Sequence, residues 1–305
     1  MLAFLLRRLA VALSVVLTVS VIAFLLLHLS GDLATDLAGP EASPEQVAQV
    51  RAEYGLDQPL AVQYGHWLAG AVRFDFGQSF YFRESVASLV GDRIPITLKL
   101  GAIALGLALL FAIPLGALAA VKRGSWFDRA SLAFCALGQA VPTFWLGLTL
   151  IIIFSVNLRW LPVSGNATWS HYVLPSVALG WYAIPAVMRL TRNGMLDVMA
   201  SDYIRTARAK GLRPKTVIFK HALRNAVVPV VALAAVQFGF MLGGSIVVEA
   251  VFSMQGLGQL AWEAIGRKDF PVVQAIVMLL ATIYILLTFL ADILNAWLDP
   301  RIRVA

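Results

Sequence analysis

Charged side chains are scarce in this chain of 305 residues. Asp, Glu, Lys and Arg together make up 13% of the sequence, whereas hydrophobic residues make up 60%. A soluble domain of ordinary composition is roughly a quarter charged and about half apolar. The composition therefore excludes an ordinary soluble domain and indicates a protein that crosses a membrane several times.

Cysteine is almost absent. Cys135 is the only one, so the chain forms no internal disulfide and has no cysteine-based metal site. It lies in an apolar run, where a small packing residue is expected. The four histidines are scattered along the sequence without the spacing of metal ligands: His28, His66, His171 and His221.

Motifs for nucleotide binding and for hydrolysis are missing. The sequence contains no Gly-x-x-x-x-Gly-Lys-Ser/Thr phosphate loop, no Gly-x-Ser-x-Gly elbow and no His-Glu-x-x-His helix. We therefore predict no catalytic site, no cofactor and no metal site in this chain. The net charge of +7 lies beside apolar runs, so membrane topology explains it better than nucleic-acid binding does.

Six apolar stretches are candidates for crossing the membrane. A helical span needs about 20 such residues, and the stretches lie at residues 9–29, 100–121, 130–158, 172–188, 226–248 and 271–291. The first is longer than the core of a signal peptide, the alternative interpretation. Of 24 Lys and Arg residues, 16 fall in the segments proposed to face the cytoplasm, including a basic tail at 299–305. We predict an all-α integral membrane protein, one domain over 1–305, with six transmembrane helices and both termini cytoplasmic.

Residues 30–99 are polar and rich in Gly and Pro, and we predict that they form an outer segment. Ser43 and Pro44 suit the N-cap and first position of a helix that stops at Gly55. Aromatic residues between 57 and 82 suit the membrane interface. The alternative is a loop that rests on the membrane without a partner.

A basic stretch follows the fourth span, within the predicted inner segment 189–225. Gly211 suits the left-handed position after a helix, and Pro214 suits the first turn of the next one. We predict two short helices joined by a sharp corner. A loop that only orients the protein through its positive charge is the alternative.

This stretch resembles the cytoplasmic coupling loop of ABC importer permeases, and most closely that of the dipeptide/oligopeptide (peptide/nickel) permease family. The matching residues are Tyr203, Arg205–Leu212, His221–Ala226 and Pro229. Arg205 stands where the wider importer consensus has Glu, which favours the peptide subfamily. Further resemblance extends along the chain at 55–68, 74–80, 138–147, 158–165, 247–274 and 298–303. The long outer segment resembles that of the first-type (B-like) subunit.

The resemblance implies a set of partners in the bacterial inner membrane. They are a second, homologous permease subunit, two ABC ATPase subunits that bind ATP and Mg, and a periplasmic or lipid-anchored substrate-binding protein. Membrane lipid surrounds the chain, and no nucleic acid is expected. The residues expected to dock on the ATPase are Tyr203, Arg205, Thr206, Ala207, Arg208, Ala209, Lys210, Gly211 and Leu212. Asp57 and Trp67 are candidates for docking the binding protein.

The resemblance also implies import of dipeptides or oligopeptides, driven by ATP hydrolysis on the partners. Relatives with the same motifs carry nickel, glutathione or other small solutes, so these cargoes remain alternatives. Candidate path residues are Gln139, Thr143, Gln237 and Ser245, although hydrogen bonding between helices is the alternative for each. An ion-coupled carrier or channel is disfavoured because we expect no ionisable residue in the middle of a span.

Overall fold

The computed structural model describes residues 2–29, 32–39 and 41–298, and the basic tail predicted at 299–305 lies outside the described residues. The regular elements among the described residues are all helices, and one isolated bridge joins Gln78 and Ser85. The N-terminal half contains α1 (Leu2–Leu29), α2 (Leu33–Ala38), α3 (Pro44–Glu53), α4 (Leu60–Val72), α5 (Val86–Val121), α6 (Trp126–Ala140), α7 (Thr143–Leu150) and the π-helix η1 (Ile151–Asn157). The C-terminal half contains α8 (Ser170–Trp181), α9 (Ile184–Met199), α10 (Asp202–Ala209), α11 (Pro214–Thr216), the π-helix η2 (Val217–Leu223), α12 (Arg224–Ala226), α13 (Val228–Val251), α14 (Leu257–Gly266) and α15 (Phe270–Leu298).

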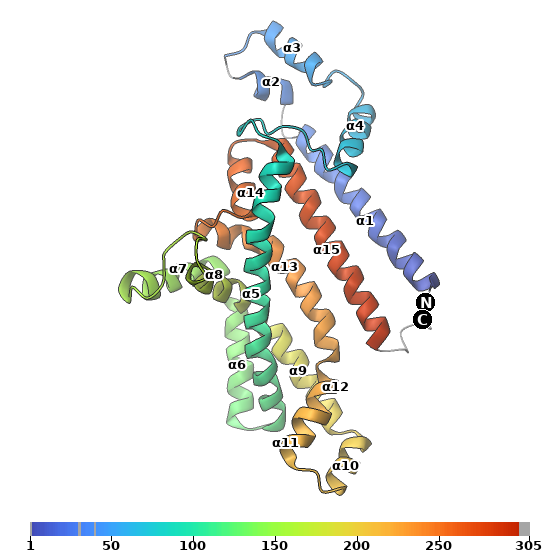
Figure 1. Ribbon diagram of the computed structural model, residues 1–305, viewed down its shortest axis with the longest axis vertical. Coiled ribbons are helices and arrows are strands. Elements are labelled where there is room, and N and C mark those ends of the chain that lie inside the picture. Colours follow the sequence, from blue (N-terminus) through green and yellow to red (C-terminus); the bar gives the residue numbers. More distant parts are fainter. Residues whose placement is uncertain (1, 30–31, 40, 299–305) are drawn as a thin grey trace.

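Within the described part of the chain, four single helices are long and apolar enough to cross a membrane: α1, α5, α13 and α15. In Figure 1, α2 and α3 lie at one end of the molecule and α10 and α11 at the other. Helix α5 runs through the centre and packs against α8, α9 and α13, whereas α15 lies between α13 and α1. Two bent helix pairs bring the possible number of spans to six.

The third and fourth predicted spans are bent, and each bend lies beside a proline. The axis turns by 98° between α6 and the α7–η1 segment, and by 57° between α8 and α9. Pro142 follows the end of α6 and Pro185 lies in the first turn of α9. Proline lacks an N–H and restricts the residue before it, so it marks positions where a helix stops or bends.

Two helices extend beyond the predicted spans. Helix α5 begins at Val86, so the last residues of the predicted outer segment 30–99 already belong to a long helix. Helix α9 continues to Met199, so the predicted inner segment 189–225 begins inside a helix. Both helices extend past the apolar stretch because packing and hydrogen bonding continue to favour the helical conformation there.

The close contacts of α8 and α9 with α5 depend on small residues. Ala104, Ala108 and Ala112 are fully buried on α5. A Cβ atom at Gly180 of α8 would lie 2.6 Å from the Ala104 carbonyl oxygen, and one at Gly116 of α5 would lie 2.5 Å from the Met188 carbonyl oxygen. Small residues allow membrane helices to approach closely, and here they hold both halves of the α8–α9 pair against α5.

Candidate functional site

The corner, residues 202–216, connects α10 to α11 at the end of the molecule away from α2 and α3 (Figure 1). Gly211 has a φ of +74°. Its N–H donates to the Arg208 carbonyl at 2.9 Å, and the Leu212 N–H donates to the Ala207 carbonyl at 3.4 Å. This pair of bonds is a Schellman motif, which requires the left-handed conformation after the helix. The predicted corner at Gly211 is confirmed.

Helix α10 is amphipathic. Ile204 and Ala207 are 0% and 7% exposed, and they pack with Met195 of α9 and Val217 of η2. The other predicted docking residues are exposed: Tyr203, Arg205, Thr206, Arg208, Ala209, Lys210, Gly211 and Leu212. The inward face anchors α10, which leaves the outward face open to a partner.

Ala207 does not take the exposed position that the sequence predicted for it. It belongs to the same buried cluster as Ala117 and Ala120 at the end of α5. Residues three apart lie on one face of a helix, so Ala207 shares the buried face of Ile204. Its small side chain fits inside this cluster and does not belong to the exposed face of α10.

Two exposed residues that follow the corner in the chain were missed as site residues by sequence reasoning. The Asn225 side-chain amide donates to the Tyr203 hydroxyl at 2.9 Å and to the His221 carbonyl at 3.0 Å, which joins α10 to α12. Phe219 is 61% exposed beside this basic surface. Charge and an exposed aromatic ring together suit a protein interface. The match of Asn225 to the coupling-loop pattern was the only signal for it.

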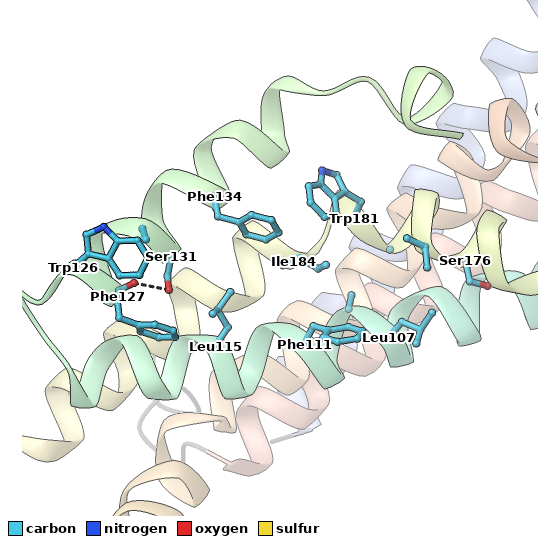
Figure 2. Close-up of a pocket in the computed structure, with 14 residues that line it drawn as sticks. Leu107, Phe111, Leu115, Trp126, Phe127, Ser131, Phe134, Ser176, Trp181 and Ile184 are labelled. Carbon is cyan, nitrogen blue, oxygen red and sulfur yellow. Dashed lines mark hydrogen bonds between the residues drawn. The ribbon is translucent and has the colours of Figure 1, made fainter. Parts of the chain in front are cut away.

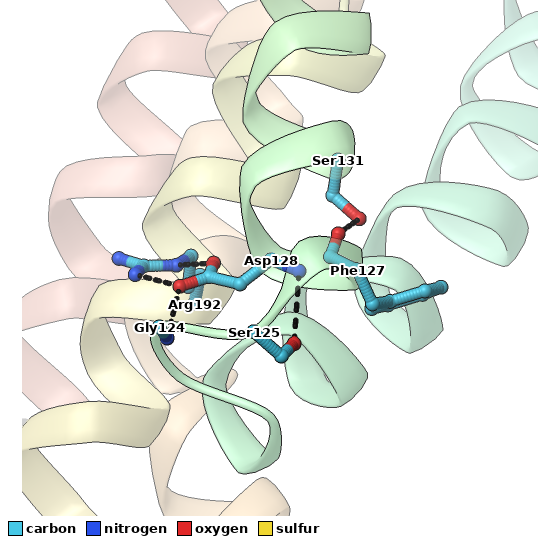
Figure 3. A network of polar contacts seen from close by, with 6 residues as sticks. All are labelled: Gly124, Ser125, Phe127, Asp128, Ser131 and Arg192. Atoms are coloured by element: carbon cyan, nitrogen blue, oxygen red, sulfur yellow. Dashed lines mark hydrogen bonds and ion pairs between the residues drawn. The ribbon is translucent and has the colours of Figure 1, made fainter.

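An ion pair fixes α6 to α9, the helix that leads into the corner. The Arg192 Nε and Nη2 atoms donate to the two Asp128 carboxylate oxygens at 2.6 and 2.8 Å, and the two side chains are only 15% and 5% exposed. The Gly124 N–H donates to Asp128 Oδ2 at 3.0 Å, and the Asp128 N–H donates to the Ser125 hydroxyl at 3.3 Å (Figure 3). A bidentate, buried pair of this kind holds two helices in one register.

The two helix bends meet at their broken ends. The Trp181 indole N–H, at the end of α8, donates to the Gly138 carbonyl near the end of α6 at 3.0 Å. This bond satisfies a carbonyl that has no partner within a helix ending at this point. Gln139 lies one residue further and accepts from Arg189 Nη1 at 3.2 Å. Thr143 begins α7, so two predicted path residues lie on either side of the break.

An apolar groove of about 610 Å³ lies beside the break. Figure 2 shows its walls on α5 and α6, with Phe134 and Trp181 between them and the indole nitrogen directed toward α6. The two rings make an edge contact with centroids 5.0 Å apart. Ser131 donates to the carbonyl of Phe127 in its own helix, which leaves the lining almost entirely apolar. The groove suits apolar groups and cannot itself recognise charge.

Gln237 and Ser245 lie on α13, a different helix from those on either side of the α6 break. They are 6% and 0% exposed. The Ser245 hydroxyl donates to the Leu242 carbonyl of its own helix at 2.8 Å. Buried polar groups of this kind serve packing between helices, so their burial favours that alternative over contact with cargo.

In the outer segment, the predicted helix is confirmed. Ser43 and Gln46 form a capping box at the start of α3, with bonds of 3.3 and 2.8 Å. Asp57 is exposed after α3, as a docking residue must be. Trp67 is only half-buried, but its ring packs against Phe24 of α1, with centroids 6.1 Å apart. Trp67 therefore attaches α4 to α1, and only part of its surface is open to a partner.

A buried carboxylate organises the end of α13 nearest to the outer segment. Glu249 is 0% exposed and accepts from the Thr97 hydroxyl at 2.7 Å and from the Gly258 N–H at 2.7 Å. It also accepts from the Gln259 N–H at 3.2 Å. A carboxylate at a helix N-terminus satisfies N–H groups and complements the helix dipole. Glu249 thus joins α5, α13 and α14, which explains its burial without any role for cargo.

This helical arrangement is shared with a chain of a solved ABC transporter. The inward-facing MetNI methionine ABC transporter, in its CY5 native crystal form, has a TM-score of 0.58 to this chain. The likeness covers 69% of this chain and 96% of that chain at 22% sequence identity, so it concerns the fold alone.

The family follows from the sequence. The profile described as binding-protein-dependent transport system inner membrane component matches residues 112–304, and the corresponding N-terminal profile matches residues 1–101. The glutathione transport system permease protein GsiC of Escherichia coli (strain K12) is 46% identical over 255 residues, 83% of each chain. GsiC of Salmonella choleraesuis (strain SC-B67) is 44% identical over 257 residues, 84% of each chain. The chain belongs to this family of binding-protein-dependent permeases.

Three predictions are thereby confirmed: the importer permease family, the all-α membrane fold, and the position of the chain as a multi-pass protein of the bacterial inner membrane. A permease of this family works with ATPase and substrate-binding partners. ATP hydrolysis by separate partner subunits is consistent with the lack of a phosphate-loop motif in this sequence.

Proposed function

We propose that this chain forms part of the import path for short peptides, with glutathione as the first cargo to test. The support is the 44–46% identity to two permeases named for glutathione transport, over more than four-fifths of the chain. Dipeptides and oligopeptides were the first prediction from the sequence and glutathione was an alternative, so this proposal takes the alternative cargo. Dipeptides are the second candidate, because the coupling-loop pattern resembles that of the dipeptide/oligopeptide family.

In the proposed complex, this chain pairs with a second, homologous permease, and the two ATPase subunits bind ATP and Mg. The observation that supports ATPase docking best is the corner. Its Schellman turn and buried Ile204 face hold α10 firmly, and the opposite face carries exposed Arg205, Arg208 and Lys210. A firmly held helix with an open polar face can transmit a partner's movement, whereas a loose basic loop cannot.

The proposed mechanism is alternating access, in which α9 transmits movement of the corner to the bend between α8 and α9. Helix α9 runs from the α8 bend to the corner, and its 16 residues span about 24 Å. The Asp128–Arg192 pair joins it to α6. A shift of α10 that follows ATP binding on the partners would therefore move both broken helices together and change the path at their junction.

Purification of the tagged chain in mild detergent, followed by identification of co-purifying proteins, tests the assembly. We expect an ATPase, a second permease and, with cargo present, a binding protein. Reconstitution of that complex in proteoliposomes tests the cargo. Radiolabelled glutathione should accumulate only with ATP and the binding protein. Accumulation of nickel or of a dipeptide, but not of glutathione, would contradict the proposed first cargo and identify the alternative.

A further inference from the structure

Arg189 lies close to the bend between α8 and α9, and a charged side chain was not expected so near a helix break. The sequence places it at the start of the cytoplasmic segment, yet it is the sixth residue of α9, only four residues after the bend that ends at Pro185. It is exposed, and its guanidinium donates to the Gln139 side chain, also exposed, at 3.2 Å. Side chains on a helix tilt toward its N-terminus. For α9 this direction leads away from the corner and toward the break in α6.

The position of Gln139 sets the depth of this contact. The turn before α6 carries Lys122 and Arg123 and belongs at the cytoplasmic face. Asp128 lies in the first turn of α6, next to this face. Gln139 follows it by eleven residues, about 16 Å along α6 at 1.5 Å per residue. The apolar core of a bilayer is about 30 Å thick. The Arg189–Gln139 contact therefore lies inside the membrane, near its middle.

A cation at this depth needs a polar environment. Among the described residues, no carboxylate lies within ion-pair distance of Arg189, whereas neighbouring Arg192 is held by Asp128. Ionisable residues within membrane spans face a bundle interior or a water-filled cavity, and they mark substrate pathways. The site also lies where two broken helices meet, held together by the Trp181–Gly138 bond. Transporters commonly bind substrate at such discontinuous helices.

We propose that Arg189 and Gln139 form a carboxylate-recognition site in the translocation path. The guanidinium offers further donors for a cargo carboxylate, and the Gln139 amide N–H₂ can donate alongside it. The ligand class is a small solute with a free carboxylate, such as a peptide C-terminus. This inference builds on the proposed function and makes it specific, because a bare divalent cation such as nickel would be repelled by Arg189.

The site is tested with probes that differ only in charge. Photoreactive 4-azidobenzoate and its neutral analogue 4-azidobenzamide are applied to the purified complex in nanodiscs without binding protein, and labelled peptides are mapped by mass spectrometry. We expect the acid to label α6 and α9 near residues 139 and 189, with much weaker labelling by the amide. Arg189→Gln should reduce labelling by the acid about tenfold or more, the loss expected for one charge-assisted hydrogen bond. Arg189→Lys should retain part of it.

Arg129→Gln is the matched control, because Arg129 is an exposed arginine at the cytoplasmic end of α6. It should leave the labelling unchanged. Equal labelling by acid and amide, or labelling by the acid that survives Arg189→Gln, would overturn the site. Import of glutathione by the same complex is measured separately. Absence of import together with Arg189-dependent labelling would overturn the proposed cargo and leave the carboxylate site standing.

Discussion

Backbone conformation at a single residue shapes the corner. Gly211 has a φ of +74°, and a Cβ atom there would meet nothing within 4 Å, so conformation and not space excludes other residues. A side chain in the left-handed region costs roughly 1–2 kcal/mol, more when it is β-branched. We expect Gly211→Val to reach the membrane but to recover about tenfold less ATPase in a pull-down, since 1.4 kcal/mol corresponds to tenfold.

Two variants control this prediction. Gly124 has a φ of +78° in the turn between α5 and α6, again with open space, so Gly124→Val introduces the same strain outside the corner. It should retain the ATPase. Gly211→Asn should recover much of the binding, because Asn tolerates the left-handed region. Normal ATPase recovery by Gly211→Val would show that the corner conformation is irrelevant to docking.

Neighbouring alanines on α10 should respond differently to added bulk. Ala207 is 7% exposed within a packed cluster, whereas Ala209 is exposed. Overpacking a buried site costs roughly 1–3 kcal/mol. We expect Ala207→Trp to lower the abundance of the chain in the membrane, and Ala209→Trp to keep normal abundance while losing ATPase recovery. The measurements are quantitative immunoblotting of membranes and the same pull-down. Normal abundance with lost ATPase recovery for Ala207→Trp, together with reduced abundance for Ala209→Trp, would contradict a docking face on the exposed side of α10.

At the scale of whole elements, a buried ion pair, Asp128–Arg192, helps hold α6 against α9. Removing one partner of a buried pair leaves an uncompensated charge and costs about 3–5 kcal/mol. We expect Arg192→Gln to lower the thermal unfolding temperature of the detergent-purified chain markedly. The exposed Arg205–Asp202 pair on α10 supplies the control. Because exposed pairs contribute about 0–1 kcal/mol, Asp202→Asn should change the unfolding temperature little. Equal shifts for the two variants would show that the Asp128–Arg192 pair does not carry the α6–α9 contact.

For the molecule as a whole, the test is its orientation across the membrane. A reporter that is active only outside the cytoplasm should be active when fused near Glu53, Asn166 or Met254. It should be silent near Ser125 or Lys210. The expectation rests on the distribution of Lys and Arg and on the lengths of the spans. Activity at Lys210 would place the corner outside the cytoplasm, where it could not meet an ATPase.

Features that depend on neighbouring residues could be predicted from the sequence. The capping box at Ser43, the left-handed turn at Gly211 and the helix start at Pro214 follow from the chemistry of a few adjacent residues. Composition indicated the membrane, and the length of the apolar runs located the single spans. Pro142 and Pro185 lie beside the two bends, but the extent of bending depends on what the broken helix ends contact.

Contacts between distant residues were decided only by the tertiary structure. The Asp128–Arg192, Gly138–Trp181 and Gln139–Arg189 contacts join residues 64, 43 and 50 positions apart. The sequence by itself determined that this is a helical membrane protein with a basic corner, because hydrophobicity and turn chemistry act locally. The buried face of α10 and the contact of Arg189 with Gln139 follow from how the helices pack, since only packing brings separate segments of the chain into contact.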